Sequence, residues 1–305
     1  MNSGSGIFRL KPYQISFENI RISRDEGVAT GSFVLDLRTK KLVQLEAQAH
    51  LQPAAMAAWF EPSLLPLLDH LQFPQAPNLR LKSDEQDSRP EFSMHIDMDS
   101  GVVFRCGLLE VPLISAGADL RKNQDEIDLA IPNGRIGAGQ CSVTVQQMHP
   151  NAPLDSQITF DRVSLSDLRI RSALLAGWQG QLSGWLKNRF GVSDSSRDSA
   201  EGKLVLDAAD FSGPHFVEPG FKKLISAGFN RLGQLTAEFA ANLGLLKINR
   251  LSLASGEHVL DLSGSVDFAS AAIHLSGRLD QDAGTARVTG SITEPDWEIS
   301  FPRRD

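Results

Sequence analysis

The sequence is dominated by short runs in which apolar and polar residues alternate, separated by Gly, Asp, Asn, Ser or Pro. This pattern is typical of half-buried antiparallel strands joined by turns, because successive side chains of a strand point to opposite faces. Residues 91–99 are the clearest case. Their apolar side chains, Phe92, Met94, Ile96 and Met98, fall on one face, and Ser93, His95, Asp97 and Asp99 fall on the other. The chain therefore favours a sheet with one apolar and one solvated face.

The same period recurs toward both ends of the chain. Residues 29–37 and 43–51 predict two strands joined by a turn at residues 38–41. Residues 127–131 alternate before Pro132-Asn133-Gly134, which predicts a turn, and the glycines of residues 134–139 predict a tight bend. From Leu260 onward the alternation is almost unbroken, which indicates a β-meander. Its apolar positions are Leu260, Leu262, Val266, Phe268, Ile273, Leu275, Leu279, Val288 and Ile292.

Three segments have helical spacing instead. Residues 53–71 begin with a proline suited to the first helical position and are broken by Pro62 and Pro66. Residues 166–178 begin with possible capping residues and carry an apolar stripe, and residues 218–232 repeat apolar residues at helical intervals. The polar stretch 192–202 has no apolar periodicity and predicts a loop.

Composition excludes some classes of function. A net charge of -7 gives no electrostatic reason to bind nucleic acid, which requires a concentrated basic surface. The two cysteines, Cys106 and Cys141, are too few for a disulfide framework or a zinc site. We interpret them as small buried residues, with one bridge between neighbouring strands as the alternative.

Motifs for catalysis and cofactor binding are missing from the sequence. The seven histidines follow no metal-binding spacing, and neither a nucleophile elbow nor a phosphate-binding loop occurs. His95, Asp97 and Asp99 share a strand face and could approach a cation, but a solvated outer face is the simpler interpretation. We predict no catalytic residue, no metal site and no cofactor. The four tryptophans are interpreted as core anchors or, together with residues 218–232, as a membrane or partner contact.

The N-terminal residues, MNSGSGIFRLKPYQ, have neither an apolar signal-peptide core nor a cleavage pattern. No apolar run approaches the ~20 residues that a spanning helix needs. Because strand-like sequence follows almost at once, we expect a fragment whose upstream part is missing.

Several sequence pieces follow one another between residues 174 and 297: a glycine-spaced strand at 202–210, an amphipathic helix at 218–232, and the run LTAEF at 235–239. These pieces are followed by LSLASGEHVLDLSGSVDFASAAIHLSGRLD at 251–280 and GSITEPDW at 290–297. In this order the pieces resemble the C-terminal region of AsmA-like bacterial envelope proteins. The glycine bend at 134–139 and the paired strands of residues 15–51 extend the resemblance more loosely over most of the chain. Lys222 and Lys223 depart from the more apolar helix expected there.

This resemblance implies a fold and a function. The expected fold is mostly β, an elongated, curved, antiparallel sheet that forms a groove (a β-taco), with a few short helical inserts. We expect residues 1–163 to be an upstream β-groove segment with a helical insert near 53–71, and residues 164–305 to be the AsmA-like C-terminal region. The family implies a periplasmic or cell-envelope location and a role in outer-membrane biogenesis or phospholipid transport, although the family's inner-membrane anchor is not present in this chain.

The expected ligands are lipid acyl chains, with phospholipid as the favoured source. An apolar sheet face must be covered by helices, by another sheet or by a ligand, and helical sequence is sparse here. The candidate lipid-facing residues are those of the two strongest alternating runs: Phe92, Met94, Ile96, Met98, Leu260, Leu262, Val266, Phe268, Ile273 and Leu275.

Two alternative functions are open at this point. The first is a closed β-sandwich or solenoid that binds another envelope protein by strand addition. The second is an enzyme acting on envelope polysaccharide, which requires a pair of carboxylates in a cleft.

Overall fold

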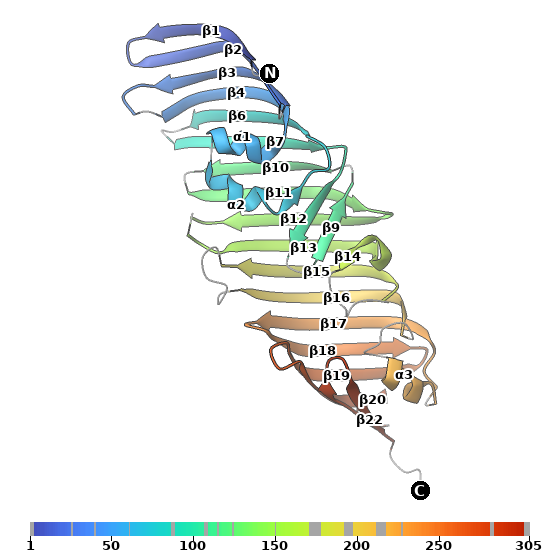
Figure 1. The fold of residues 1–305 in the computed structure, drawn as a ribbon. Helices are drawn as coiled ribbons and strands as arrows, with labels where there is room; N and C mark the ends of the chain where they lie inside the picture. Colours follow the sequence, from blue (N-terminus) through green and yellow to red (C-terminus); the bar gives the residue numbers. More distant parts are fainter. Residues whose placement is uncertain are drawn as a thin grey trace. The chain divides into compact units, whose positions relative to one another are not determined.

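The fold was analysed in a computed structural model, which describes residues 3–301 except 26, 40, 61, 87–88, 107–108, 115, 124, 150, 171–177, 192–197, 212–217, 227 and 281–283. Strands account for 71% of the chain, and hydrogen bonds join 18 of them into one antiparallel sheet (Figure 1). Four short strands form a second sheet in the order β14-β9-β8-β5. The prediction of a mostly-β, antiparallel architecture with short helical inserts is confirmed.

The chain divides into two compact units. Unit 1 contains residues Met1–Gly107, Val111–Arg135 and Ser142–Ala152, and unit 2 contains Leu108–Glu110, Ile136–Cys141 and Pro153–Asp305. Strands of the large sheet that belong wholly or mostly to unit 1 are β1 (Ser3–Lys11), β2 (Gln14–Arg24), β3 (Gly27–Asp36), β4 (Lys41–Leu51), β6 (Asn78–Gln86), β7 (Arg89–Met98), β10 (Ala116–Asn123), β11 (Glu126–Ile136) and β12 (Gly139–Gln147).

The core of unit 1 follows from the register of these strands. Residues directly opposite each other in antiparallel strands share a face, so apolar residues at paired positions form continuous rows. One row crosses five strands from Ile22 through Ala29, Ala49 and Leu79 to Ile96. We call the face that carries this row the inner face of unit 1.

Unit 2 contains the meander that the sequence predicts. Its strands are β13 (Leu154–Ser164), β15 (Gln181–Phe190), β16 (Ser199–Asp210), β17 (Leu232–Asn242), β18 (Leu245–Ser255), β19 (His258–Asp267), β20 (Ala272–Leu279), β21 (Gly284–Ser291) and β22 (Pro295–Ser300). From β15 to β22 each strand pairs with the next. An apolar row runs from Leu182 through Leu206, Leu235 and Leu253 to Leu260, and it defines the inner face of unit 2.

The short sheet is built from β5 (Leu71–Gln72), β8 (Val102–Cys106), β9 (Leu109–Leu113) and β14 (Arg169–Ile170). Its central strands contribute buried side chains, including Val102, Phe104, Val111 and Leu113. This sheet was not predicted, because five-residue and two-residue strands give too short an alternation to recognise.

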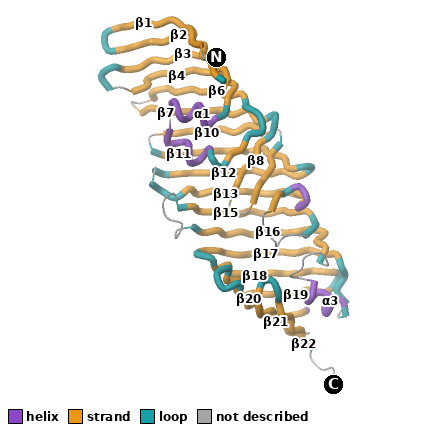
Figure 2. Tube along the Cα trace, viewed as in Figure 1, coloured by secondary structure: helices purple, strands orange, loops and turns teal. Residues whose placement is uncertain are grey.

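Helices occur at two of the three predicted places (Figure 2). The proline-broken insert forms α1 (Pro53–Phe60), the 3-10 turn η1 (Pro62–Leu64) and α2 (Leu65–Leu68), as predicted. The third helix, α3 (Glu218–Ile225), is shorter than predicted because β17 already begins at Leu232. Within the described ranges, no helix is long and apolar enough to cross a membrane.

The helix predicted at residues 166–178 is wrong over its described part. A single 3-10 turn, η2 (Leu165–Asp167), is followed directly by β14. Leu168 adopts an extended conformation and is buried, so its apolar character serves packing rather than a helical stripe. Residues 171–177 lie outside the described part of the chain.

Two predicted turns are also corrected. Pro132-Asn133-Gly134 does not form a turn, because β11 continues through it to Ile136. Pro132 and Asn133 are both exposed, so the alternation slips there by one residue, as it does at a bulge. The bend comes at Gly137, with a φ of 57°, inside the predicted glycine cluster. Of the predicted loop 192–202, residues from Ser199 onward belong to β16, and residues 192–197 are not described.

Candidate functional site

Nine of the ten candidate lipid-facing residues are buried by the chain itself. Ile96 and Leu260 are 0% exposed, and the others except Phe268 lie in the core as well. Phe268 is the exception, with 47% of its surface exposed, because β19 ends at Asp267 and Phe268 lies in the following turn. An acyl chain would reach the nine buried residues only after displacement of the groups that cover them.

In unit 1, the inserted helices cover the middle of the inner face. Figure 1 shows α1 and α2 over the sheet, and Met56, Leu64 and Leu67 of this insert are fully or almost fully buried. Met56 shares a hollow with Leu45 and Ala47 of β4. The insert therefore supplies much of the covering that the sequence analysis expected a ligand to provide.

Side chains on the inner face of unit 1 are exposed on β1 and mostly half-buried on β2 and β3. A hollow lies over β2 to β4, lined by Ile20, Ile22, Ala29, Thr30, Gly31, Ser32, Phe33, Leu45, Ala47 and Met56. The rings of Phe17 and Phe33 stack at 4.4 Å beside it, and Phe8 packs against Phe17 at 5.4 Å. Phe8 and Leu10 of β1 are mostly exposed, although both share this apolar face with Phe17 and Ile15. We call the part of the inner face on β1 to β3 the open face.

Unit 2 has a comparable half-buried strip. On the inner face of β15 to β18, Leu182, Leu206 and Leu253 are buried. Other side chains of the same face are half-buried: Leu186, Leu204, Ala237, Phe239, Leu246 and Ile248. The Phe239 ring lies against Gly202, and a Cβ atom at that position would come within 2.9 Å of it. Farther along, α3 covers the inner face, because its Phe221 contacts Phe211 and its Gly220 lies on the Trp297 indole.

The helix α3 does not offer its apolar side to a membrane. Phe221 and Leu224 are buried, and the Lys223 ammonium donates a hydrogen bond to the Trp297 carbonyl oxygen. Trp297 itself is buried in the core. Core packing is therefore the role of this helix and this tryptophan.

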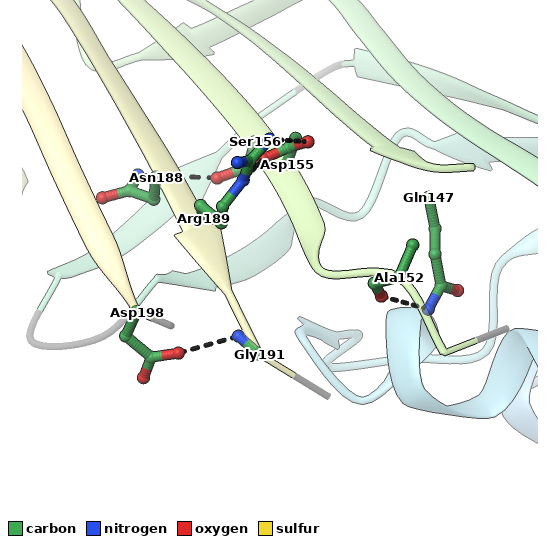
Figure 3. Close-up of polar contacts among 8 residues, drawn as sticks. All are labelled: Gln147, Ala152, Asp155, Ser156, Asn188, Arg189, Gly191 and Asp198. Carbon is green, nitrogen blue, oxygen red and sulfur yellow. Dashed lines mark hydrogen bonds and ion pairs between the residues drawn. The ribbon is translucent and has the colours of Figure 1, made fainter. Parts of the chain in front are cut away.

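The opposite face of unit 2 is solvated and carries cross-strand ion pairs. Arg189 and Asp155 form a two-bond pair at 2.7 and 3.0 Å (Figure 3), and Lys203 meets Glu238 at 2.8 Å. Hydrogen bonding to Lys203 lowers the pKa of Glu238. These pairs are largely exposed, so solvent screening leaves each a small contribution to stability. The two faces thus differ sharply, with apolar side chains on one and charges on the other.

Polar side chains do not assemble into a reactive centre in the part of the chain that is described. His95 of the proposed cation site lies 2.7 Å from Asp119 rather than between Asp97 and Asp99, and the described residues hold no group of three metal-binding side chains. His258 and Asp280 meet at 2.7 Å, and the second Asp280 oxygen accepts a hydrogen bond from the Val259 amide, which ties the end of β20 to β19.

The buried thiol agrees with a packing role. Cys141 is buried in β12, and burial raises the pKa of its thiol to about 12. The structure does not describe the side chain of Cys106, so the alternative of a bridge between the two cysteines stays a hypothesis.

Sequence analysis missed the open face for an identifiable reason. A bulge between Phe17 and Ile20, with Asn19 at a φ of 51°, shifts the alternation by one residue. Phe17 and Ile20 therefore share a face although their spacing suggests opposite faces. The odd interval between Phe17 and Ile20, with Asn19 between them, is the sequence signal that could have revealed the bulge and the open face.

Comparison of the chain with protein-family models, with curated proteins and with solved structures gives no match.

Proposed function

We propose that this protein is a non-enzymatic, lipid-handling protein of the AsmA-like type, which shields acyl chains on the open face of unit 1. The observation that carries the proposal is an apolar sheet face that the chain's own helices cover only in part, with a hollow in the remainder. The order of sequence pieces at residues 174–297 supports the family, and with it a role in phospholipid transport or outer-membrane biogenesis in the periplasm.

The energetics of this role require no specific polar site. Each CH₂ group that leaves water for an apolar surface gains about 0.8 kcal/mol, so several methylenes on the open face give useful binding. Ile20, Ile22 and Phe33 present the surface, and the opposite face of these strands keeps charges such as Arg9 and Glu18 in water. The half-buried strip of unit 2 offers a second surface of the same chemical kind.

The test compares two neighbouring residues of β2 that point to opposite faces. The protein would be purified without detergent from a bacterial host, and bound lipid would be detected by native mass spectrometry and by lipid extraction. Ile22→Asp places a charge in the hollow and should abolish bound phospholipid and uptake of a fluorescent fatty acid. Ser23→Asp places the same charge on the other face and should leave both unchanged.

The main alternative is a module that binds another envelope protein. Among the described strands, β1 pairs with β2 alone, and its other edge could accept an added strand. A lipid-free mass for the wild-type protein, together with no uptake of the fluorescent fatty acid, would refute lipid shielding and favour this module.

A further inference from the structure

The outermost strand of unit 1 has an unprotected edge. Among the described strands, β1 pairs with β2 alone, and all nine of its residues are exposed (Figure 1). Ile7, Phe8 and Leu10 nevertheless have apolar side chains, which are 48%, 57% and 66% exposed. Proteins commonly protect such edges with a proline, a bulge or a covering segment. The sequence of β1, SGSGIFRLK, contains no proline, and the bulge beside it is formed by Asn19 of β2. The edge is therefore open to another strand.

The free edge presents the backbone groups of the even-numbered residues of β1. The Leu37 amide donates a hydrogen bond of 2.8 Å to the Tyr13 carbonyl oxygen, so Tyr13 directs its backbone groups toward β3. Successive residues of a strand direct these groups to opposite sides, so Gln14 bonds with β1, at Lys11 opposite it. The same alternation along β1 turns the amides and carbonyls of four residues toward the free edge: Gly4, Gly6, Phe8 and Leu10.

The sequence of β1 is complementary to itself when two copies pair antiparallel about Ile7. Small residues, SGSG, precede Ile7, and larger ones, FRLK, follow it. The residues of the two strands then lie opposite each other in a fixed order: Phe8 opposite Gly6, Arg9 opposite Ser5, Leu10 opposite Gly4 and Lys11 opposite Ser3. Each large side chain thus meets a small one, and aromatic side chains cover glycines of edge strands favourably. The even-numbered residues of both copies also bring their free backbone groups together.

This register pairs the whole strand and keeps like charges apart. Arg9 and Lys11 lie opposite serines, and Arg9 is already paired with Glu18 of its own chain at 3.0 Å. Pairing about Gly6 or about Phe8 would leave two residues of each β1 without a partner. Pairing about Arg9 would place two guanidinium groups opposite each other, which is unfavourable. The full-length register is therefore favoured.

The last strand of unit 2 has an edge that the chain uses itself. This strand is β22, and its Trp297 carbonyl oxygen accepts a hydrogen bond from Lys223 of α3. A second copy that added its β1 to β22 would have to displace this bond. Pairing of two β1 strands is therefore favoured over head-to-tail pairing.

We propose that the protein forms a homodimer in which the two β1 strands pair antiparallel about Ile7. Phe17 and Phe33 stack at 4.4 Å, and Phe8 packs on Phe17 at 5.4 Å, so Phe8 ends an aromatic row at the edge. In the dimer this row continues into the second copy, because Phe8 lies over Gly6 of that copy and diagonally next to its Phe8. The two open faces then form one apolar surface. The proposal concerns the assembly of the chain and does not require a bound lipid.

The first experiment measures the mass of the 305-residue protein in solution by sedimentation equilibrium. The wild-type protein should have twice the 33.2 kDa of one chain at micromolar concentrations. Ile7→Lys places two ammonium groups opposite each other at the centre of the interface and should weaken dimerisation at least about tenfold. The matched control is Gln48→Lys, at an exposed position of β4 that pairs with β3 and β6, and it should remain dimeric. Circular dichroism checks that both variants are folded.

The second experiment tests the register by disulfide crosslinking. In a background of Cys106→Ser and Cys141→Ala, Ile7→Cys places two thiols opposite each other in a pair without hydrogen bonds, whose Cα atoms lie about 4.5 Å apart. That spacing suits a disulfide, so mild oxidation should give covalent dimers. Arg9→Cys is the control, because the two copies of residue 9 lie about 13 Å apart along the strands. It should crosslink at least about tenfold more slowly.

Four results would overturn the proposal. They are a wild-type protein with the mass of one chain, equal dimerisation of the wild type and Ile7→Lys, equal crosslinking of the two cysteine variants, and a mass that rises past two chains with concentration. The last result would indicate head-to-tail assembly instead.

The dimer and the shielding of acyl chains can fail separately, because the mass is measured without lipid. A dimer that takes up no fluorescent fatty acid would contradict shielding alone. A monomer that takes up the fatty acid would contradict the dimer alone.

Discussion

Two isoleucines of one cross-strand row provide the sharpest test of the inner face. Ile22 and Ile96 lie on the same face of unit 1, connected through Ala29, Ala49 and Leu79. Ile96 is 0% exposed, whereas Ile22 lines the hollow and is only partly buried. The substitutions Ile22→Ala and Ile96→Ala remove the same atoms, so any difference between them reports how the face is covered.

The expected magnitudes follow from burial. Truncation of a fully buried isoleucine costs about 2–5 kcal/mol, because the lost apolar contact and the cavity both contribute. At Ile22 the side chain is already partly in water and no closed cavity forms, so a cost of roughly 1 kcal/mol is expected. Ile96→Ala should therefore lower the urea midpoint clearly more than Ile22→Ala.

Ligand binding should show the reverse order. The affinity for a fluorescent fatty acid should fall in Ile22→Ala, whose side chain contacts the ligand, and should stay near wild type in folded Ile96→Ala. Both quantities are measured on the same preparations, by urea titration and by fluorescence. If Ile96→Ala left the midpoint unchanged and abolished uptake, Ile96 would face the ligand, and our account of a covered inner face would be wrong.

Three further predictions concern local structure. Cys141 should react with a thiol reagent only on unfolding, because a pKa of about 12 keeps its buried thiol protonated. The reaction is measured at pH 8 in a Cys106→Ser background, so that Cys141 is the thiol that is followed. Gly277→Ala should unfold at a much lower temperature than Gly4→Ala, because a Cβ at 277 overlaps a backbone carbonyl and one at 4 makes only an ordinary van der Waals contact. Hydrogen bonds from Ser270 lower the pKa of Asp267 below its usual value of 3.8. The contribution of Asp267 to stability is therefore present above pH 3.8 and lost as pH falls through the lower pKa of the folded state. Nuclear magnetic resonance titration of Asp267 should show a pKa below 3.8.

The strands of the meander could be predicted because their chemistry is local. Leu260, Leu262 and Ile273 alternate with polar residues without interruption, and all three are buried where the period places them. The same local chemistry identified the proline-broken insert at residues 53–71. Phe268 differs from the other nine candidates in being exposed, because the apolar period continues by one residue past the last paired position of β19, and periodicity does not mark where pairing stops.

Coverage of the sheet could not be predicted because it depends on contacts distant in sequence. Residues 92–98 have the strongest alternation, and the same strong alternation suits a face packed under a helix as well as a face that lines a groove. The position of Met56 beside Leu45 and Ala47 shows that the insert lies over the inner face. The residues with the most regular pattern were therefore identified as ligand-facing although they belong to the core.

The hollow itself has a local cause, which can be identified once the register of the strands is known. Small residues occupy the inner face of β3 and β4 at Ala29, Gly31, Ala47 and Ala49, where the flanking strands place larger side chains. Paired small residues leave unfilled volume above the sheet, and among the described side chains of α1 it is Met56 that lines this volume. At Gly31 the close approach of β3 and β4 itself requires glycine, since a Cβ there would come within 2.4 Å of the Glu46 carbonyl oxygen. Ala29 and Ala47 are therefore the small residues that leave room in the hollow, and an apolar ligand in that room is what the lipid-shielding proposal predicts.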